Sequence, residues 1–277
     1  MPIERHIITD RQWSKIEPHC LGKKSDPGRT GGDARLFREG VFWIARTGAQ
    51  WRDLPAEFGK WNSVYRRFRD WGVGGVFERI FNALTEEPDM EMAMIDGTIV
   101  KVHRPLSAIE DNRLPGNGTG LKRGTQSQAI GKSKGGWTTK ILALTDALGN
   151  LVRFVLLPGH RFDTVGVAPL IEGITFDAML APSHGLQANH CRATDKAFDS
   201  NWIIADMNAR GALICISQRP QRLAPMVIDP EIYKCRHLIE NFFMKLKEFK
   251  RIAMRADKTD TSFKAMIYAV AALINSR

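Results

Sequence analysis

The chain has 277 residues, 43% of them hydrophobic, with a formal net charge of +10 and an isoelectric point near 9.6. This length is enough for a full hydrophobic core in one or two domains. The basic excess favours a polyanionic partner such as DNA, RNA or an anionic membrane, although a basic soluble protein without such a partner has a similar composition.

Membrane insertion and secretion are not indicated. No stretch approaches the roughly 20 apolar residues of a spanning helix, and the start of the chain lacks the apolar core of a secretory signal. The four cysteines are scattered and form no CxxC pair, which suits a reducing compartment. We therefore expect a cytoplasmic protein with no membrane partner.

Helical patterns dominate residues 8 to about 84. Asp10 is a candidate N-cap for a helix over residues 11–17, and further helices are predicted for residues 34–46, 61–68 (ending near residue 71) and 76–84. Tryptophans alternate here with arginines, including Arg66 and Arg67, which is typical of a helical region that binds DNA. A tryptophan core with a solvated arginine face explains the pattern equally well. We predict a helical DNA-binding region over residues 1–88.

After Pro88 the hydrophobic period becomes strand-like. Strands are predicted for residues 92–102, 138–144 and 151–157, the last two joined by a turn at residues 146–150. Asp163 and Asp199 are candidate N-caps for helices over residues 163–174 and 199–209, and a short strand follows at 212–217. A long helix from about residue 230 to 255 and a last helix over 261–274 complete the chain. This element order predicts an RNase H-like α/β core over residues 89–277.

A long basic loop is predicted between the first two of these strands. Residues 103–136 are rich in glycine, serine, lysine and arginine and poor in large apolar side chains. Lys132 and Lys134 lie in its last part, at residues 131–136, which we predict to be flexible. Because lysines neutralise phosphates, these two residues are candidate contacts to a nucleic-acid backbone.

Two acidic residues stand out by their local context. Asp96 lies within an apolar strand, where a carboxylate is costly to bury unless it is paired or binds a cation. On a helix, Glu240 shares an arc of about 60° with Tyr233, Arg236 and Lys247, beside an apolar face. Such a carboxylate can hold a metal while its basic neighbours contact phosphates. The simpler alternatives are a solvent-facing Asp96 at a strand end and an ordinary charge ladder around Glu240.

Asp195 is a third acidic residue, and its local pattern does not distinguish a functional role from a structural one. Asp195 precedes a predicted helix and is equally well explained as a turn residue. Asp146 and Asp163 compete for the role, but both have structural explanations, the first in a turn and the second as a helix cap.

The spacing Tyr233-x2-Arg236-x3-Glu240-x6-Lys247 resembles the signature helix of the insertion sequence 5 group of DDE transposases, within the insertion sequence 4-like set. "GKSKGGWTTKILALTDALGN" is similar to the segment that follows the first acid in that family. "DKAFDSNWI" is similar to its second-acid motif, and "FREGVFWIARTGAQWRDLPAEFGKWNSVYRRFRDW" is similar to its N-terminal region. The resemblance covers nearly the whole chain.

The resemblance implies that Asp96, Asp195 and Glu240 are the catalytic, metal-binding acids of an RNase H-like core. It also implies that Tyr233, Arg236 and Lys247 support Glu240 and contact DNA. The implied cofactor is a pair of Mg2+ ions roughly 4 Å apart, with Mn2+ as a substitute. The implied partners are the terminal inverted repeats and target DNA, bound by a homodimer.

The implied function is metal-dependent cleavage at transposon ends followed by strand transfer. Two departures favour an alternative, a decayed or repurposed transposase that only binds DNA. Phe198 stands where the family has Tyr, and residues 183–192 are polar where an apolar strand would lead into the second acid. A nuclease with the same metal site but no joining step is a third hypothesis.

Overall fold

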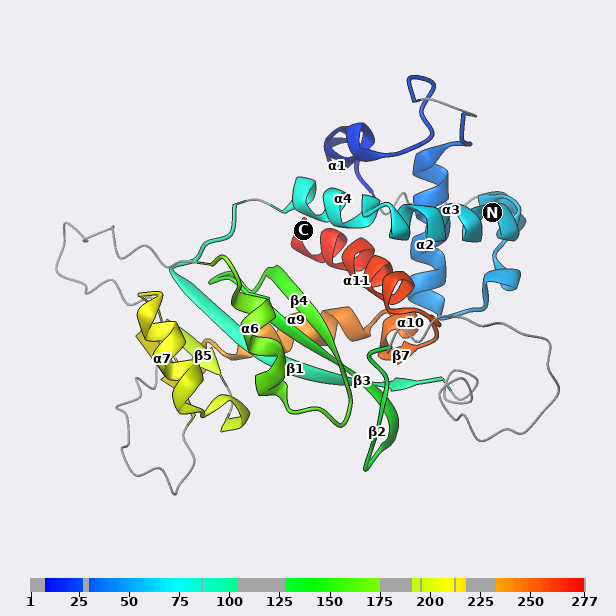
Figure 1. The fold of residues 1–277 in the computed structure, drawn as a ribbon. Coiled ribbons are helices and arrows are strands. Elements are labelled where there is room, and N and C mark those ends of the chain that lie inside the picture. Colours follow the sequence, from blue (N-terminus) through cyan, green and yellow to red (C-terminus); the bar gives the residue numbers. More distant parts are fainter. Residues whose placement is uncertain are drawn as a thin grey trace. The chain divides into compact units, whose positions relative to one another are not determined.

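The computed structural model describes residues 8–26, 30–85, 87–103, 128–174, 191–194, 196–211, 213–217 and 233–276. Contacts divide the chain into two compact units (elements labelled in Figure 1). Unit 1 comprises residues 1–86, 100–139 and 246–277, and unit 2 comprises residues 87–99 and 140–245. Each unit is built from separate stretches of the chain, so the domain boundary expected between residues 88 and 89 stays a prediction. No helix among the described residues is long and apolar enough to span a membrane.

Unit 1 is built mainly from helices. Its elements are α1 (Asp10–Ile16), α2 (Ala34–Thr47), α3 (Trp61–Val73), α4 (Val76–Leu84), α10 (Lys250–Ala253) and α11 (Asp260–Asn275), with 3-10 turns η1 (Glu17–His19), η2 (Trp51–Asp53) and η3 (Ala56–Phe58). The C-terminal helix α11 packs against α4 and α3 (Figure 1), and an aromatic contact between Phe81 and Tyr268 joins two of them. The predicted helices of this region are therefore confirmed, with ends shifted by a few residues.

The alternating tryptophans and arginines fit both interpretations in part. Trp51 and Trp71 are buried in the core of unit 1, whereas Arg66 is exposed. Arg67 is half-buried and packs against aromatic rings: its guanidinium lies 4.7 Å from the ring centroid of Phe37 and 4.8 Å from that of Trp71. Trp51 and Trp71 thus belong to the core, whereas Trp43 is half-buried and Trp61 is exposed, and the exposed arginines remain candidates for DNA contact.

The basic loop prediction is wrong at its end, because residues 131–138 form a β-hairpin. β2 (Gly131–Ser133) pairs antiparallel with the start of β3 (Gly136–Thr145), with Lys132 opposite Trp137. Gly136 has φ 98°, a conformation that favours glycine and that suits the tight turn before it. Lys132 and Lys134 are exposed on this hairpin.

One mixed sheet runs through the fold. Among the described residues its seven strands have the order β2-β3-β1-β5-β6, with β4 paired to β3 and β7 to β1. The central strand β1 (Met92–Val102) pairs in parallel with β5 (Cys191–Thr194), which pairs in parallel with β6 (Leu213–Ile216). β4 (Leu151–Pro158) follows β3 through the predicted turn, and β7 (Met254–Arg255) is parallel to the end of β1. A mixed α/β fold is therefore confirmed.

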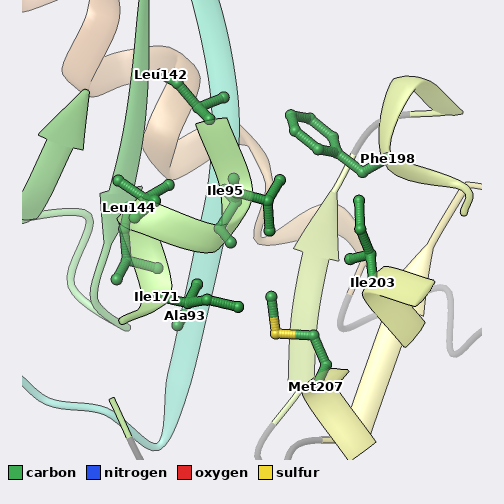
Figure 2. Packing of buried hydrophobic residues seen from close by; sticks show 10 residues of the cluster. Ala93, Ile95, Leu142, Leu144, Ile171, Phe198, Ile203 and Met207 are labelled. Carbon is green, nitrogen blue, oxygen red and sulfur yellow. The ribbon is translucent and has the colours of Figure 1, made fainter. Parts of the chain in front are cut away.

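The core of unit 2 lies against one face of β1. Ala93 and Ile95 pack there with Leu142, η5 (Lys196–Phe198), α6 (Val167–Ile171) and α7 (Asn201–Ala209). Figure 2 shows Phe198, Ile203 and Met207 facing these strand residues. Phe198 is 1% exposed, so its ring serves packing, and a Tyr at this position would need a buried partner for its hydroxyl.

Several predicted helix ends are corrected. Thr9, not Asp10, is the N-cap of α1, and it forms a capping box with Gln12. Asp163 begins a 3-10 turn, η4 (Asp163–Gly166), without a side-chain cap bond, and Ser200 rather than Asp199 precedes α7. The long predicted helix is interrupted: α9 (His237–Lys247) is followed by α10 and β7, and residues 230–232 lie outside the described part.

Candidate functional site

Asp96 lies in the middle of β1 on the face opposite the unit 2 core. Side chains alternate along a strand, so Ala93 and Ile95 point toward the apolar cluster while Asp96 points to the other side. Asp96 is 9% exposed, and its Oδ1 accepts a hydrogen bond of 2.7 Å from the backbone N–H of Gly97. The prediction of a nearly buried carboxylate in an apolar strand is confirmed, and its charge requires a partner.

Arg236 supplies that partner and joins it to the second acid. One guanidinium nitrogen, Nη2, lies 2.7 Å from Oδ2 of Asp96, and the other, Nη1, lies 2.8 Å from Oε1 of Glu240. The carboxylates come from a strand and from the first turn of α9, and one planar guanidinium spans both. Two acids far apart in the sequence are thus brought to a common cation.

The local backbone explains how Arg236 reaches both acids. Its N–H donates to the carbonyl of Tyr233, which closes a turn directly before α9, and Glu240 follows in the first helical turn. A carboxylate at that position is favoured by the positive end of the helix dipole. Gly149, with φ 79°, allows close approach here, because a Cβ at this position would lie 3.1 Å from Cβ of Leu238.

The electrostatics of Arg236 reflect this arrangement. Burial by itself lowers its pKa, but Coulomb attraction to Asp96 and the hydrogen bond with that carboxylate raise the pKa above its usual value, with Glu240 and Tyr233 adding to the effect. The guanidinium therefore stays charged, and it neutralises part of the repulsion between the two carboxylates.

The competing acids are occupied elsewhere. Asp146 accepts backbone hydrogen bonds from Leu148 and Asn150, so it stabilises the turn between β3 and β4. Asp163 forms a 2.9 Å ion pair with Lys140. Its Oδ1 would lie 3.4 Å from a Cβ at Gly97, so Asp163 borders the face of β1 opposite the Asp96 side chain.

Asp195 lies outside the described residues. The parallel pairing of β1 with β5 places Ile95 opposite Thr194, and these two residues directly precede Asp96 and Asp195 in the sequence. Among the described residues, no group of three histidine, cysteine or acidic side chains is positioned to hold a metal ion. The predicted third ligand therefore stays a prediction.

The predicted DNA contacts differ in their surroundings. Lys247 ends α9 at an i,i+7 spacing from Glu240, on the same side of the helix, and partial burial lowers its pKa. Lys132, Lys134 and Arg66 are exposed. Arg67 donates instead to the carbonyls of Gly32 (2.8 Å) and Leu21 (3.1 Å), which ties it to the N-terminal fold.

The link between Arg236 and Asp96 was missed by sequence reasoning. The helical spacing connected Arg236 with Glu240 only, because an i,i+4 pair is visible in a sequence and a contact between residues 96 and 236 is not. One indication of this contact was present in the sequence, which is that a carboxylate buried at Asp96 requires a cationic partner.

For the metal-dependent DNA cleavage that the resemblance implies, replacing Arg236 with Gln should lower the rate about 10–100-fold, the usual effect of losing a residue that would orient metal ligands from outside the metal shell. Arg236→Lys should recover only part, since an ammonium cannot span two carboxylates as a guanidinium does. Cleavage rates over a Mg2+ series provide the measurement. Lys245→Gln, which removes an exposed charge from the same helix, is the control. Wild-type dependence on Mg2+ in Arg236→Gln would contradict the positioning role.

Comparisons with known proteins identify the family of the chain. Residues 8–81 match the family described as "Putative transposase of IS4/5 family", and residues 87–275 match the family "Transposase DDE domain". No solved structure matches the chain.

Three bacterial relatives are similar to parts of the chain. A Brucella ovis protein named "Putative transposase for insertion sequence element IS6501" is 34% identical over 137 residues, which are 50% of this chain and 97% of the relative. The uncharacterized protein y4sN of Sinorhizobium fredii is 33% identical over 42% of this chain and 96% of its own length. An uncharacterized 16.2 kDa protein of insertion element IS402 from Burkholderia cepacia is 34% identical over 34% of this chain and 73% of its own length. The chain therefore belongs to the DDE transposases of the IS4/5 insertion-sequence type.

Proposed function

We propose that this chain cuts DNA at the ends of an insertion sequence and joins the freed strand to target DNA. The observation that carries the proposal is the convergence of Asp96 and Glu240 on Arg236, from a central strand and a helix start. Two carboxylates that meet one cationic side chain offer oxygen ligands of the kind that a divalent cation takes, and the net charge of +10 suits a DNA substrate.

The donor set fits a hard divalent cation. Mg2+ is bound through one or two carboxylates together with water and phosphate oxygens, and Asp96 and Glu240 offer such oxygens. Asp96, Glu240 and the predicted third acid Asp195 would hold the two metal ions. Bound there, Mg2+ supplies activation of a water or a DNA 3′-OH and stabilisation of the leaving oxygen.

The chain's own residues have separate tasks. The N–H of Gly97 fixes one oxygen of Asp96, and Arg236 fixes the other relative to Glu240. The exposed residues Lys132, Lys134 and Arg66 would neutralise phosphates along the DNA, together with Lys247 at the end of α9. Tyr233 would support the turn that carries Arg236, through the carbonyl that accepts its N–H.

We infer in addition that the core is RNase H-like. β1 lies between β3 and β5, the hairpin partner β4 lies beyond β3, and the parallel strand β6 lies beyond β5. This order, together with the DDE domain match, supports the expected fold.

The test is an assay with a plasmid that carries both ends of the element flanking the coding sequence, supplied with full-length protein and Mg2+. We expect cleavage at the ends and then insertion into a second plasmid, each abolished by EDTA. Binding to the ends without a metal-dependent product would support the DNA-binding alternative, and cleavage without joining would support a nuclease. Sedimentation of the protein with end DNA would test the proposed homodimer.

A further inference from the structure

Unit 1 contains a cavity of about 710 Å³ to which the site above contributes no residue. Its wall is formed by residues of η2, of α3, of the segment before β2, of α10, of the segment that leads into α11 and of the first turn of α11. The wall includes Trp51, Tyr65, Arg69, Arg251, Lys258 and Ser262. A volume of several hundred cubic ångströms is the usual size of a pocket for a small organic ligand.

Part of the cavity wall is aromatic. The rings of Trp51 and Tyr65 have centroids 5.4 Å apart and are tilted by 46°. Trp51 is 8% exposed, with the Arg251 guanidinium 5.6 Å from its centroid, while Tyr65 is only half-buried and presents aromatic surface. The indole N–H of Trp51 is buried without a hydrogen-bond partner, the one such buried side-chain donor in the described wall.

The charge of the wall is positive at its opening. Asp257 is already paired with Arg251 at 2.9 Å, and Nη1 of that arginine also donates to the carbonyl of Ala49. The remaining cations, Arg69 and Lys258, are exposed at the rim. A cavity with a neutralised floor, an aromatic wall and two cations at its mouth matches a flat ring attached to an anionic group.

We propose that this cavity binds one unpaired nucleotide of a DNA strand. Its base packs against Tyr65, beside Trp51, and its phosphate lies between Arg69 and Lys258, within reach of the hydroxyl of Ser262. Stacking on an aromatic ring tolerates any base, and the cations recognise the backbone. The choice of DNA as the source of the nucleotide rests on the proposed function.

The experiment compares three duplexes of one sequence: one fully paired, one with a single unpaired 2-aminopurine, and one with an abasic site in its place. Affinities of the full-length protein are measured by anisotropy in EDTA, and 2-aminopurine fluorescence reports stacking. Tyr65→Leu should weaken binding of the duplex with the unpaired base about tenfold and leave the other two unchanged. Tyr65→Phe, which keeps the ring, should bind like the wild type.

Charge variants test the mouth of the cavity. Arg69→Ala and Lys258→Ala should each weaken binding of the duplex with the unpaired base and reduce its salt dependence, measured as the log–log slope, by about 1. Lys264→Ala, an exposed lysine on α11, is the matched control. Equal weakening on all three duplexes by Tyr65→Leu, or none on any, would overturn the proposal. Binding of free dAMP as tightly as the duplex with the unpaired base would overturn DNA as the source.

The outcome is separable from that of the proposed function. Asp96→Asn should leave binding of the unpaired base unchanged, because Asp96 is not part of the cavity wall. If the wild type neither cleaves nor joins DNA but still shows the Tyr65-dependent preference, the pocket stands and the catalytic proposal fails. If the wild type cleaves and joins DNA but shows no Tyr65-dependent preference for the unpaired base, the nucleotide-pocket proposal alone fails.

Discussion

Asp96→Asn should reduce end cleavage in Mg2+ by on the order of 10²–10³-fold or more, as expected when the cation that would stabilise developing charge loses a carboxylate ligand. This corresponds to roughly 3–4 kcal/mol in the activation free energy. The amide keeps the size of the side chain and an oxygen for the N–H of Gly97, but it loses the charge that attracts a cation and Arg236. Single-turnover cleavage of end-labelled DNA is the measurement.

A second variant guards against a loss caused by unfolding. Glu240 is half exposed, with 50% of its side chain accessible, so Glu240→Gln disturbs the core less than a change at nearly buried Asp96. We expect a comparable loss of cleavage with unchanged DNA affinity, since catalysis and phosphate contact use different residues.

Asp206→Asn is the matched control, because it also removes a carboxylate from an i,i+4 ion pair with an arginine, on α7. It should cleave like the wild type. Normal cleavage by Asp96→Asn or Glu240→Gln would refute the assignment of the acids.

Arg255→Met should lower the free energy of unfolding of unit 1 by about 1–3 kcal/mol, the usual result of removing a buried hydrogen-bond donor from its acceptors. Arg255 is 0% exposed, and its guanidinium lies 2.6 Å from Oδ1 of Asp260 and 2.9 Å from Oγ1 of Thr139. It also donates to the carbonyl of Ala129. Methionine fills part of the volume but removes the guanidinium donors, so Asp260 keeps only the N–H of Ala129 among these partners and the carbonyl of Ala129 keeps only the hydroxyl of Thr139.

Urea unfolding followed by tryptophan fluorescence measures this change, since every tryptophan except Trp202 belongs to unit 1. Arg255→Lys should recover part of the loss, because one ammonium cannot reach all of the acceptors. Lys264→Met, at an exposed position of α11, should shift the midpoint little. A midpoint unchanged in Arg255→Met would show that the buried network adds nothing to stability.

The sequence alone determined the elements whose patterns are local. The predicted helix at residues 76–84 and the strand at 92–102 have the observed limits, because their apolar residues repeat with the period of one element. The family was recognisable from the spacing around Glu240, a local sequence pattern that in the structure spans α9 and the turn directly before it. Helix caps were harder to predict from the sequence. Thr9 and Asp10 are both suitable N-caps for α1, and the choice depends on which side chain reaches the N–H of Gln12.

Only the tertiary structure decided which charged residues meet. The pairing of Arg236 with Asp96, the ion pair of Lys140 with Asp163 and the buried network of Arg255 all join residues from different elements, and no sequence period encodes those contacts. The hairpin at residues 131–138 was missed for the same reason. Its first strand, β2, is short and weakly apolar, and it forms by pairing with β3. Asp96, Asp195 and Glu240 as a set remain a prediction from resemblance. The fold adds the physical link between the first and the last of them, one guanidinium held between a strand and a helix start.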